Sequence, residues 1–175
     1  MNETFFISDT HFGHARALQL FRSGHFKDCK EMDETMITNW NSVVNPRDVV
    51  WHMGDFSWGN QTYYARRLNG QLNLILGNHD YIEPLERQAF NSIHDYKKIK
   101  INNQKIILFH YPIHYWECSH YGSWHLYGHV HGQRKNIGLS MDVSAECIKY
   151  TPISFSEIKV KMGALPQHDH KEDYT

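Results

Sequence analysis

Small polar side chains that can bind metal ions follow apolar runs at several places in the sequence. In LILGNHD (residues 74–80) an apolar run leads into a glycine, an amide, an imidazole and a carboxylate, although Gly-Asn-x-Asp alone is also ordinary turn chemistry. Similar polar groups follow other apolar runs. In sequence order, the groups are Asp9 and His11; Asp55; Asn78, His79 and Asp80; His110; and His129 and His131. Neutral imidazole is the commonest metal ligand and histidine makes up 14 of the 175 residues, so this set indicates a metal centre.

The spacing and the number of these groups favour two metal ions over one. In an extended segment residues i and i+2 point the same way, so the D-x-H and H-x-H pairs can each present two groups to one place. One ion would leave ligands unused, whereas two ions about 3.5–4 Å apart that share a carboxylate would use them all. Mixed nitrogen and oxygen ligation suits Mn, Fe, Zn, Co or Ni, and the lack of cysteine ligands argues against a closed structural zinc site.

Strands whose ends meet must position these ligands. A continuous apolar run such as LNLIL is typical of a buried strand, and strand carboxyl ends face the ligand crevice in open α/β sheets. The sequence predicts strands over residues 4–9, 48–55, 71–80, 124–132 and 136–144, and a hairpin over 96–112 with an Asn-Asn-Gln turn. It predicts helices over 14–21, 29–44, 61–70 and 81–90, and for 154–162 it favours a helix over the alternative of a strand. This order favours an α/β (α+β) domain with two sheets or one long mixed sheet.

Length, charge and cysteine content narrow the class of protein. The 175 residues fit a single domain, predicted over 1–165, with a polar tail over 166–175 that we expect to be disordered. The formal net charge of −1 argues against a dedicated nucleic-acid-binding surface. Three widely spaced cysteines with no secretory segment favour the cytoplasm, and no apolar run approaches the ~20 residues that cross a bilayer. We therefore expect a cytoplasmic protein with no membrane partner, whose oligomeric state the sequence leaves open.

The ordered series D-x-H, G-D, G-N-H-D, H and G-H-x-H, between Ser8 and Gly132, resembles the calcineurin-like metallophosphoesterase superfamily. The stretches NWNSVV, PRDVVWHMGDFS and MDV resemble a small bacterial and phage branch of it. The resemblance implies a metallophosphoesterase-like β-sandwich, in which two packed mixed β-sheets are flanked by helices. It also implies a binuclear phosphoesterase that hydrolyses phosphate esters with metal-activated hydroxide.

The resemblance also implies a role for each ligand. Two divalent ions are expected, with Mn foremost and Fe, Zn, Co, Ni or Mg as alternatives. The first would be bound by Asp9, His11 and His131, the second by Asn78, His110 and His129, with Asp55 bridging them. His79 would lie beside the leaving-group oxygen, to donate a proton to it or to stabilise its charge, and Asp80 would fix the tautomer of that imidazole.

The expected substrate is a phosphate ester. A phosphodiesterase acting on nucleotide-like substrates or RNA ends is the first hypothesis, and a phosphomonoesterase of the same fold or a non-catalytic metal-binding scaffold are the alternatives. A metallo-β-lactamase-like enzyme is disfavoured because its HxHxDH string does not occur. The aromatic continuation FSWGN after the Gly-Asp block departs from many relatives, so substrate contacts there are expected to differ.

Several other residues have both a functional and a structural interpretation. His14 could reach a substrate phosphate or could cap the following helix. The aromatic segment between His110 and His129 could stack a nucleobase or could cover the sheet. His52 and Trp40 are predicted to be core residues, and the cysteines to be buried small hydrophobes.

Overall fold

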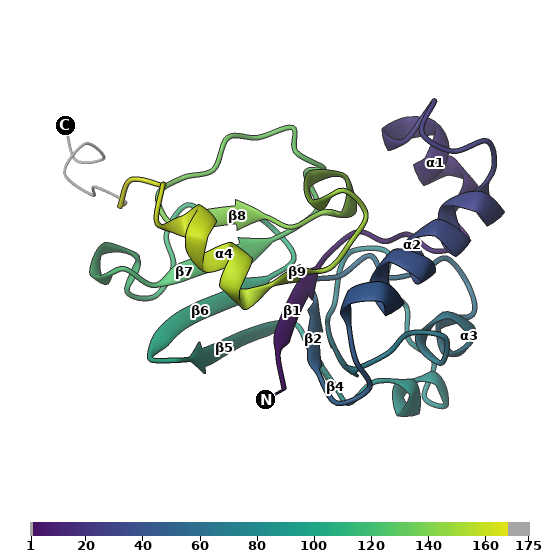
Figure 1. Ribbon diagram of the computed structural model, residues 1–175, viewed down its shortest axis with the longest axis horizontal. Coiled ribbons are helices and arrows are strands. Elements are labelled where there is room, and N and C mark those ends of the chain that lie inside the picture. Colours follow the sequence, from purple (N-terminus) through teal and green to yellow (C-terminus); the bar gives the residue numbers. More distant parts are fainter. Residues whose placement is uncertain (1, 168–175) are drawn as a thin grey trace.

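Two mixed β-sheets form the centre of the protein, which is described here by a computed structural model over residues 2–167 (Figure 1). The first sheet has the order β4-β3-β2-β1-β9, in which β1 to β4 are parallel and β9 is antiparallel. Its strands are β1 (Thr4–Ile7), β2 (Val49–His52), β3 (Gln71–Ile75), β4 (Ser92–His94) and β9 (Ile153–Ser154). The second sheet has the order β5-β6-β7-β8, with β5 antiparallel to β6 and the others parallel. Its strands are β5 (Tyr96–Ile101), β6 (Gln104–Phe109), β7 (Trp124–Tyr127) and β8 (Ser140–Asp142).

Helices flank the sheets, with α1, α2 and α3 on the right in Figure 1 and α4 on the left. They are α1 (Ala15–Phe21), α2 (Cys29–Val43), α3 (Gln61–Ala65) and α4 (Phe155–Met162). Three short 3₁₀ helices lie in connections between strands: η1 (Glu86–Ala89), η2 (Ser119–Tyr121) and η3 (Ala145–Ile148). The longest, α2, begins after Asp28, whose carboxylate accepts the Glu31 N–H. Met32, Met36 and Trp40 recur every four residues along it and are buried, so one stripe of the helix faces the core.

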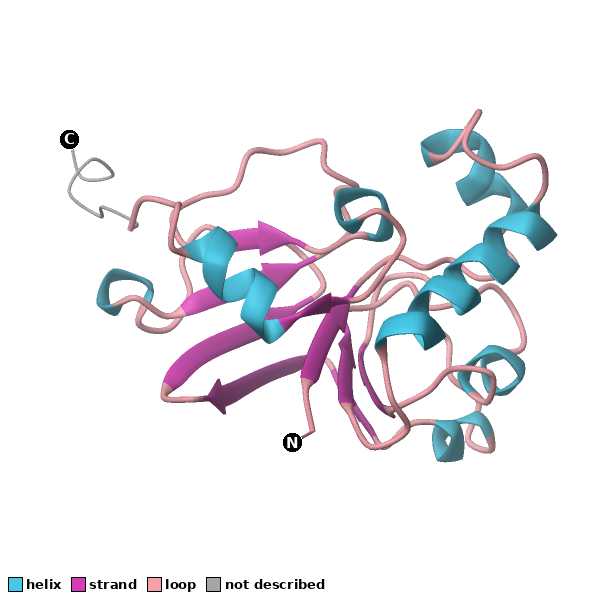
Figure 2. Cartoon of the chain, viewed as in Figure 1, coloured by secondary structure: helices cyan, strands magenta, loops and turns pink. Residues whose placement is uncertain are grey.

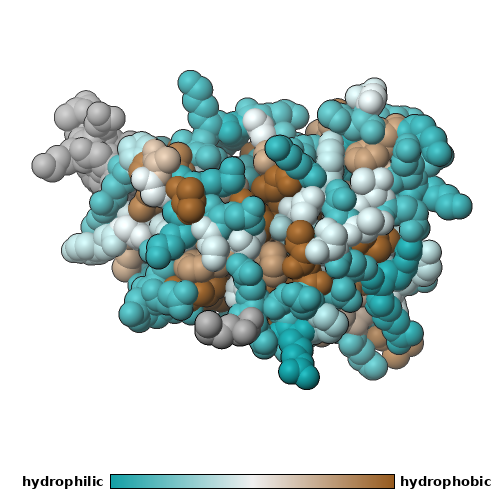
Figure 3. All heavy atoms as spheres, viewed as in Figure 1, coloured by the Kyte–Doolittle hydropathy of each residue, from teal (hydrophilic) through white to brown (hydrophobic). Residues whose placement is uncertain are grey.

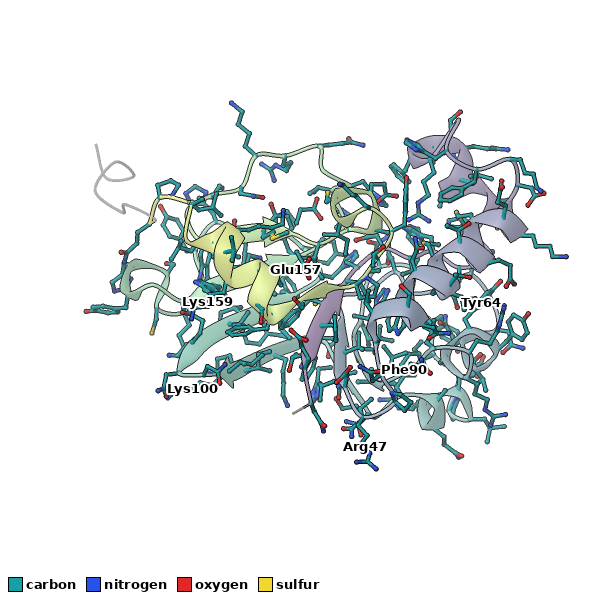
Figure 4. The ribbon with its side chains drawn as sticks, in the orientation of Figure 1. Arg47, Tyr64, Phe90, Lys100, Glu157 and Lys159 are labelled. Atoms are coloured by element: carbon teal, nitrogen blue, oxygen red, sulfur yellow. The ribbon has the colours of Figure 1, made fainter. Side chains whose placement is uncertain are left out.

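One hydrophobic core joins the two sheets and the helices. Phe6 and Leu74 of the first sheet, Leu108 and Leu126 of the second, and Trp40 of α2 are all completely buried in the same cluster. On the face seen in Figure 3, hydrophilic residues interleave with hydrophobic ones. Figure 4 shows Lys100 at the outer end of the β5–β6 hairpin. The expected α/β class with two mixed sheets is confirmed.

The hairpin and most elements lie where the sequence predicts them. Asn102 and Asn103 both have positive φ, at 47° and 67°, which is the backbone of a tight hairpin turn that asparagine tolerates. The predicted helix over 154–162 is confirmed as α4, and His52 and Trp40 are core residues as expected. Part of the tail expected to be disordered, residues 168–175, lies outside the described residues.

Two expectations are wrong, and two strands were not predicted. The segment 81–90 forms only the 3₁₀ turn η1, because Phe90 must already turn into the first sheet ahead of β4. The short strands β4 and β9 were not predicted, since strands of three and two residues carry too little periodicity to be read from sequence. None of the three cysteines is buried as expected, since Cys29 and Cys118 are half-buried and Cys147 is exposed.

The topology brings strand ends together. The carboxyl ends of parallel strands meet at one edge of a sheet, and a bridge between Ser8 and Ser144 joins the two sheets there. In Figure 2 the arrowheads of β7 and β8 point toward the middle of the molecule, where β1 also ends. Within residues 2–167 no helix is both long and apolar enough to span a bilayer.

Candidate metal centre

The loops after five strands converge on one cluster of carboxylates and imidazoles. Each predicted ligand directly follows a strand: Asp9 and His11 follow β1, Asp55 follows β2, Asn78 follows β3, His110 follows β6, and His129 and His131 follow β7. Both sheets therefore contribute to the same site.

The first group of close ligand atoms is the one that the sequence predicts. Nε2 of His11 lies 3.8 Å from Oδ1 of Asp9, and Nε2 of His131 lies 3.6 Å from the same oxygen. The His131 ring stacks on Phe21, at 3.7 Å between centroids, and lies 5.4 Å from the His11 ring. Three ligand atoms thus face a single point from two sheets.

Asp55 lies between this group and a second one. Its Oδ2 is 3.6 Å from Nε2 of His11, and its Oδ1 is 3.7 Å from Nε2 of His110. Ligand atoms of Asp9, Asp55 and His110 also lie within 4.8 Å of one another, so Asp9 takes part in both groups, which the sequence did not predict. The carboxylate of Asp55 is oriented as a bridge between the two positions would be.

The remaining predicted ligands of the second position surround His110. Oδ1 of Asn78 lies 3.1 Å from Nε2 of His110. The ring of His129 is 5.1 Å from the ring of His110, and its backbone N–H donates to Asp9 Oδ2 over 3.0 Å. Tyr111 packs against His129, with ring centroids 4.6 Å apart, so the aromatic segment after β6 borders the site at its first residue.

Two observations indicate that this set of donor atoms fits metal ions. Oδ1 of Asp9 and Nε2 of His11 are buried and have no hydrogen-bond partner, although buried polar atoms are almost always paired. Five ligands have left-handed backbone, with φ of 55° at Asp9, 48° at His11, 56° at Asp55, 70° at His129 and 47° at His131. Such strain is uncommon outside glycine and clusters at functional sites. A divalent cation would satisfy both orphaned atoms.

The same angles correct the geometric argument made from the spacing. Asp9 with His11, and His129 with His131, were expected to point the same way because the chain was taken to be extended. Each pair instead lies in a turn beyond the end of its strand. The side chains converge because the backbone turns.

Burial sets the charge of these groups. Desolvation raises the pKa of Asp9 to about 7, and the nearby His131 offsets this only in part. Desolvation, followed by the charge of Arg22, lowers the pKa of His11 to about 2, so this imidazole is neutral, the form that binds metal. Burial alone would lower the pKa of His131, but its hydrogen bond to Glu146 and the charge of Asp9 raise it.

Arg22 and Glu146 support the first group, and sequence reasoning missed both. Nδ1 of His131 is 3.1 Å from Glu146 Oε2, and Nε of the fully buried Arg22 donates to Glu146 Oε1 over 2.6 Å. Arg22 also donates to the carbonyl oxygens of Asp9 and Thr10. Ser144 Oγ lies 3.0 Å from Asp9 Oδ2, and the only sequence signal near it is the MDV stretch.

Asp80 has a role different from the expected one. Its Oδ2 accepts the N–H groups of Asp55, at 2.7 Å, and Gly77, at 2.9 Å, while Oδ1 accepts that of Phe56, at 2.9 Å. Within residues 2–167 no hydrogen bond joins it to His79. Desolvation raises the pKa of Asp80 to about 6 against these bonds. Asp80 therefore pins the loop after β3 to the loop that carries Asp55.

Position 77 requires glycine because the loop of Asp55 approaches it closely, and not because of its own backbone conformation. Its φ is outside the left-handed region, yet a Cβ atom there would collide with Oδ1 of Asp55. Gly128 is similar, because a Cβ would collide with Ser8 Oγ and Asp9 Oδ2. Both glycines let neighbouring loops approach the cluster.

His79 and His14 lie at the exposed edge of the cluster. The His79 ring is 5.8 Å from the His11 ring, and its backbone N–H donates to Asp55 Oδ1 over 2.9 Å. His14 precedes α1 but makes no side-chain cap; its ring stacks on Trp58 at 4.4 Å, and its Nδ1 lies 3.4 Å from Nδ1 of His11. Its suggested contact with a substrate phosphate stays a prediction.

Comparison with known proteins agrees with this fold and site. The profile of the Calcineurin-like phosphoesterase superfamily domain matches residues 3–138. An uncharacterized protein of Methanocaldococcus jannaschii is 32% identical over 174 residues, which cover 90% of each chain. The gene 66 protein of Mycobacterium phage L5 is 36% identical over 102 residues, 55% of this chain and 48% of that protein. A solved structure of a protein of unknown function from Aquifex aeolicus has a TM-score of 0.76 and 28% identity, covering 92% of this chain and 100% of that one.

The fold is that of an α/β protein with two mixed sheets, and carboxylates and imidazoles gather at the ends of its strands. The protein therefore has a cluster of side chains that fits metal ions. Since the family profile covers most of the sequence, the chain belongs to the calcineurin-like phosphoesterase superfamily, and the predicted resemblance is confirmed.

Proposed function

We propose that this protein is a phosphoesterase that depends on two divalent metal ions, and that it hydrolyses phosphodiesters of nucleotide-like substrates. The observation that carries the proposal is the pair of buried, unpartnered atoms, Asp9 Oδ1 and His11 Nε2, inside a cluster of further ligands. The superfamily supplies the reaction class.

One position would be held by Asp9, His11 and His131, and the other by Asn78, His110 and His129, with Asp55 facing both. Divalent ions so bound supply Lewis-acid activation of water and neutralise charge on a phosphate group. Mixed imidazole, amide and carboxylate donors suit Mn, with Fe, Zn, Co, Ni and Mg as alternatives.

The chain's own groups orient the reaction. Hydrolysis forms a phosphorus–oxygen bond to water, breaks the bond to the leaving alcohol and delivers a proton to the alcohol oxygen. His79 is exposed at the edge of the cluster, and its backbone N–H donates to Asp55, which supports a role for its imidazole as the donor of that proton. Asp80 keeps the loops of His79 and Asp55 in register.

The test measures turnover of bis-p-nitrophenyl phosphate, p-nitrophenyl phosphate and a 2′,3′-cyclic nucleotide by metal-stripped protein, with each metal added back. We expect metal-restored cleavage of the diester and the cyclic nucleotide. Asp55→Asn should abolish it, whereas Asp95→Asn, an exposed carboxylate before β5, should not. Turnover of the monoester alone would overturn the diester preference, and full activity of Asp55→Asn would overturn the site.

His79 is tested by the leaving group. His79→Ala should slow hydrolysis of an alkyl diester about 100-fold and that of a p-nitrophenyl diester much less, since a good leaving group needs little help from an acid. Equal losses on both substrates would contradict the proton-donor role.

A further inference from the structure

A groove of about 670 Å³ opens beside the cluster, and the site as described does not use it. Its lining includes Trp58, His79, Tyr81, Glu83, Leu85 and Glu86. The departing FSWGN stretch forms one wall and the segment after His79 forms the other. This volume lies in the range of small-molecule sites.

The groove is continuous with the catalytic cluster through His79. That residue lines the groove and lies 5.8 Å, ring to ring, from the ligand His11. The Trp58 ring is 5.9 Å from the His79 ring. An alcohol that leaves on the His79 side would therefore extend into this groove.

The walls offer apolar and aromatic surface that the fold leaves uncovered. Trp58 is 56% exposed, Tyr81 77% and Leu85 81%, which is unusual for three large apolar side chains around one hollow. The indole of Trp58 stacks at 12° and 4.4 Å on His14, which holds it in place. The indole keeps open surface on which a second flat ring could stack.

The charge of the lining selects against a second phosphate. Its only charged side chains, apart from the titratable His79, are the carboxylates of Glu83 and Glu86, and no Lys or Arg contributes. Glu86 is held in place because it accepts the backbone N–H of Gln61 over 2.9 Å. Carboxylates accept hydrogen bonds from amino groups and repel phosphates, so the groove suits an uncharged ring that carries amino donors.

We propose that this groove binds the nucleoside of the leaving alcohol, with its base stacked on Trp58 beside Tyr81. The inference rests on the proposed phosphoesterase function and gives it a substrate class: esters whose leaving group is a nucleoside without further phosphates. His14 is then a positioning residue for Trp58.

The test uses two esters that differ only in the base, the methyl ester of adenosine 5′-phosphate and the methyl ester of ribose 5-phosphate. Stacking of one base is worth roughly 1–3 kcal/mol, so kcat/KM for release of adenosine should exceed that for release of ribose at least about 5-fold. Trp58→Ala and Tyr81→Ala should each lower this preference toward unity, by raising KM for the adenosine ester more than KM for the ribose ester. Trp58→Phe should keep most of it.

The matched control is Tyr121→Ala, since Tyr121 is 80% exposed on η2 and does not line the groove. It should leave the preference unchanged. Equal kcat/KM for the two esters in the wild type, or equal losses on both in Trp58→Ala and Tyr81→Ala, would overturn the groove assignment while leaving the phosphoesterase function intact.

A second measurement does not depend on turnover. In an NMR titration of the metal-free protein, adenosine should bind and ribose should not, and Trp58→Ala should weaken adenosine binding about 10-fold. If neither ester is hydrolysed but this binding difference holds, the catalytic proposal fails and the groove assignment stands. Adenosine binding no stronger in the wild type than in Trp58→Ala would overturn the groove assignment.

Discussion

On one side of the cluster His131 is held by the half-buried carboxylate of Glu146, whereas on the other side Nδ1 of His110 is held by the backbone carbonyl of Met53, at 2.7 Å. Glu146 is in turn paired with the buried Arg22. The first half of the site therefore depends on a chain of charges, and the second half depends on how closely two loops approach. The two halves should fail in different ways when mutated.

The largest effect is expected where a buried charge loses its partner. Arg22→Met leaves Glu146 without its guanidinium and the carbonyl groups of Asp9 and Thr10 without donors. The free energy of unfolding should fall by about 4 kcal/mol, measured by urea denaturation. The double variant Arg22→Met/Glu146→Gln should recover part of the loss, and a double variant as unstable as the sum of the singles would refute the charge pairing.

The second half of the site depends on close packing at a glycine, Gly54, and not on a pair of charges. A Cβ at Gly54 would lie 2.5 Å from the N atom of Gly77 and 2.7 Å from Nδ1 of His110, at a φ of +96°. Gly54→Ala should lower the free energy of unfolding by about 3 kcal/mol and displace His110, which calorimetric metal titration would detect.

The matched control for this variant is Gly24→Ala. Gly24 has a similar φ of +85° with nothing within 4 Å of an added Cβ, so this variant carries the backbone strain without the clash. It should lose about 1 kcal/mol and keep its metal affinity. Equal behaviour of the two variants would show that strain alone, and not the approach to His110, decides the result.

A smaller effect separates the halves by metal affinity. Glu146→Gln keeps the shape of the side chain but removes the charge that orients His131, so one metal should bind about 10-fold more weakly, as expected for outer-shell partners. Calorimetry should show the second binding event unchanged. Glu117→Gln, which removes only exposed pairs with Lys98 and Lys105, is the control. Weakening of both events in Glu146→Gln would contradict the separation of the halves.

The smallest effect concerns a histidine that belongs to neither half. His125 is buried between the carbonyl groups of Ile107 and Tyr111, and desolvation lowers its pKa from 6.5 to about 4. The unfolded chain therefore binds a proton at His125 below about pH 6.5, whereas the folded chain binds it only below about pH 4. The free energy of unfolding therefore decreases as the pH is lowered. Between pH 6.5 and 5.5 this should amount to about 1 kcal/mol. The pH dependence of unfolding should be shallower by that amount in His125→Gln; an identical dependence would contradict it.

Local patterns were enough to predict which residues gather in the cluster and the class of fold. Asp55 and Asn78 directly follow apolar strands, and the order of the blocks identified the superfamily. The conformation at the ligands could not be predicted, because left-handed backbone at Asp9 or His131 is imposed by tertiary contacts and not by their own preferences.

Supporting contacts between distant parts of the chain were also missed. Arg22 and Glu146 lie 124 residues apart, and neither stands in a motif. The resemblance implied that Asp80 holds His79, whereas its oxygens reach back to the loop of Asp55. Such partners depend on how loops of two sheets meet, which no periodicity in the sequence records.

The most direct test of two differently supported metal positions is a calorimetric titration of the metal-stripped protein with Mn²⁺, in which turnover of bis-p-nitrophenyl phosphate is followed in the same samples. We predict two binding events per chain, with turnover appearing as the second position fills. Full turnover at one equivalent, with no second event, would contradict the binuclear site.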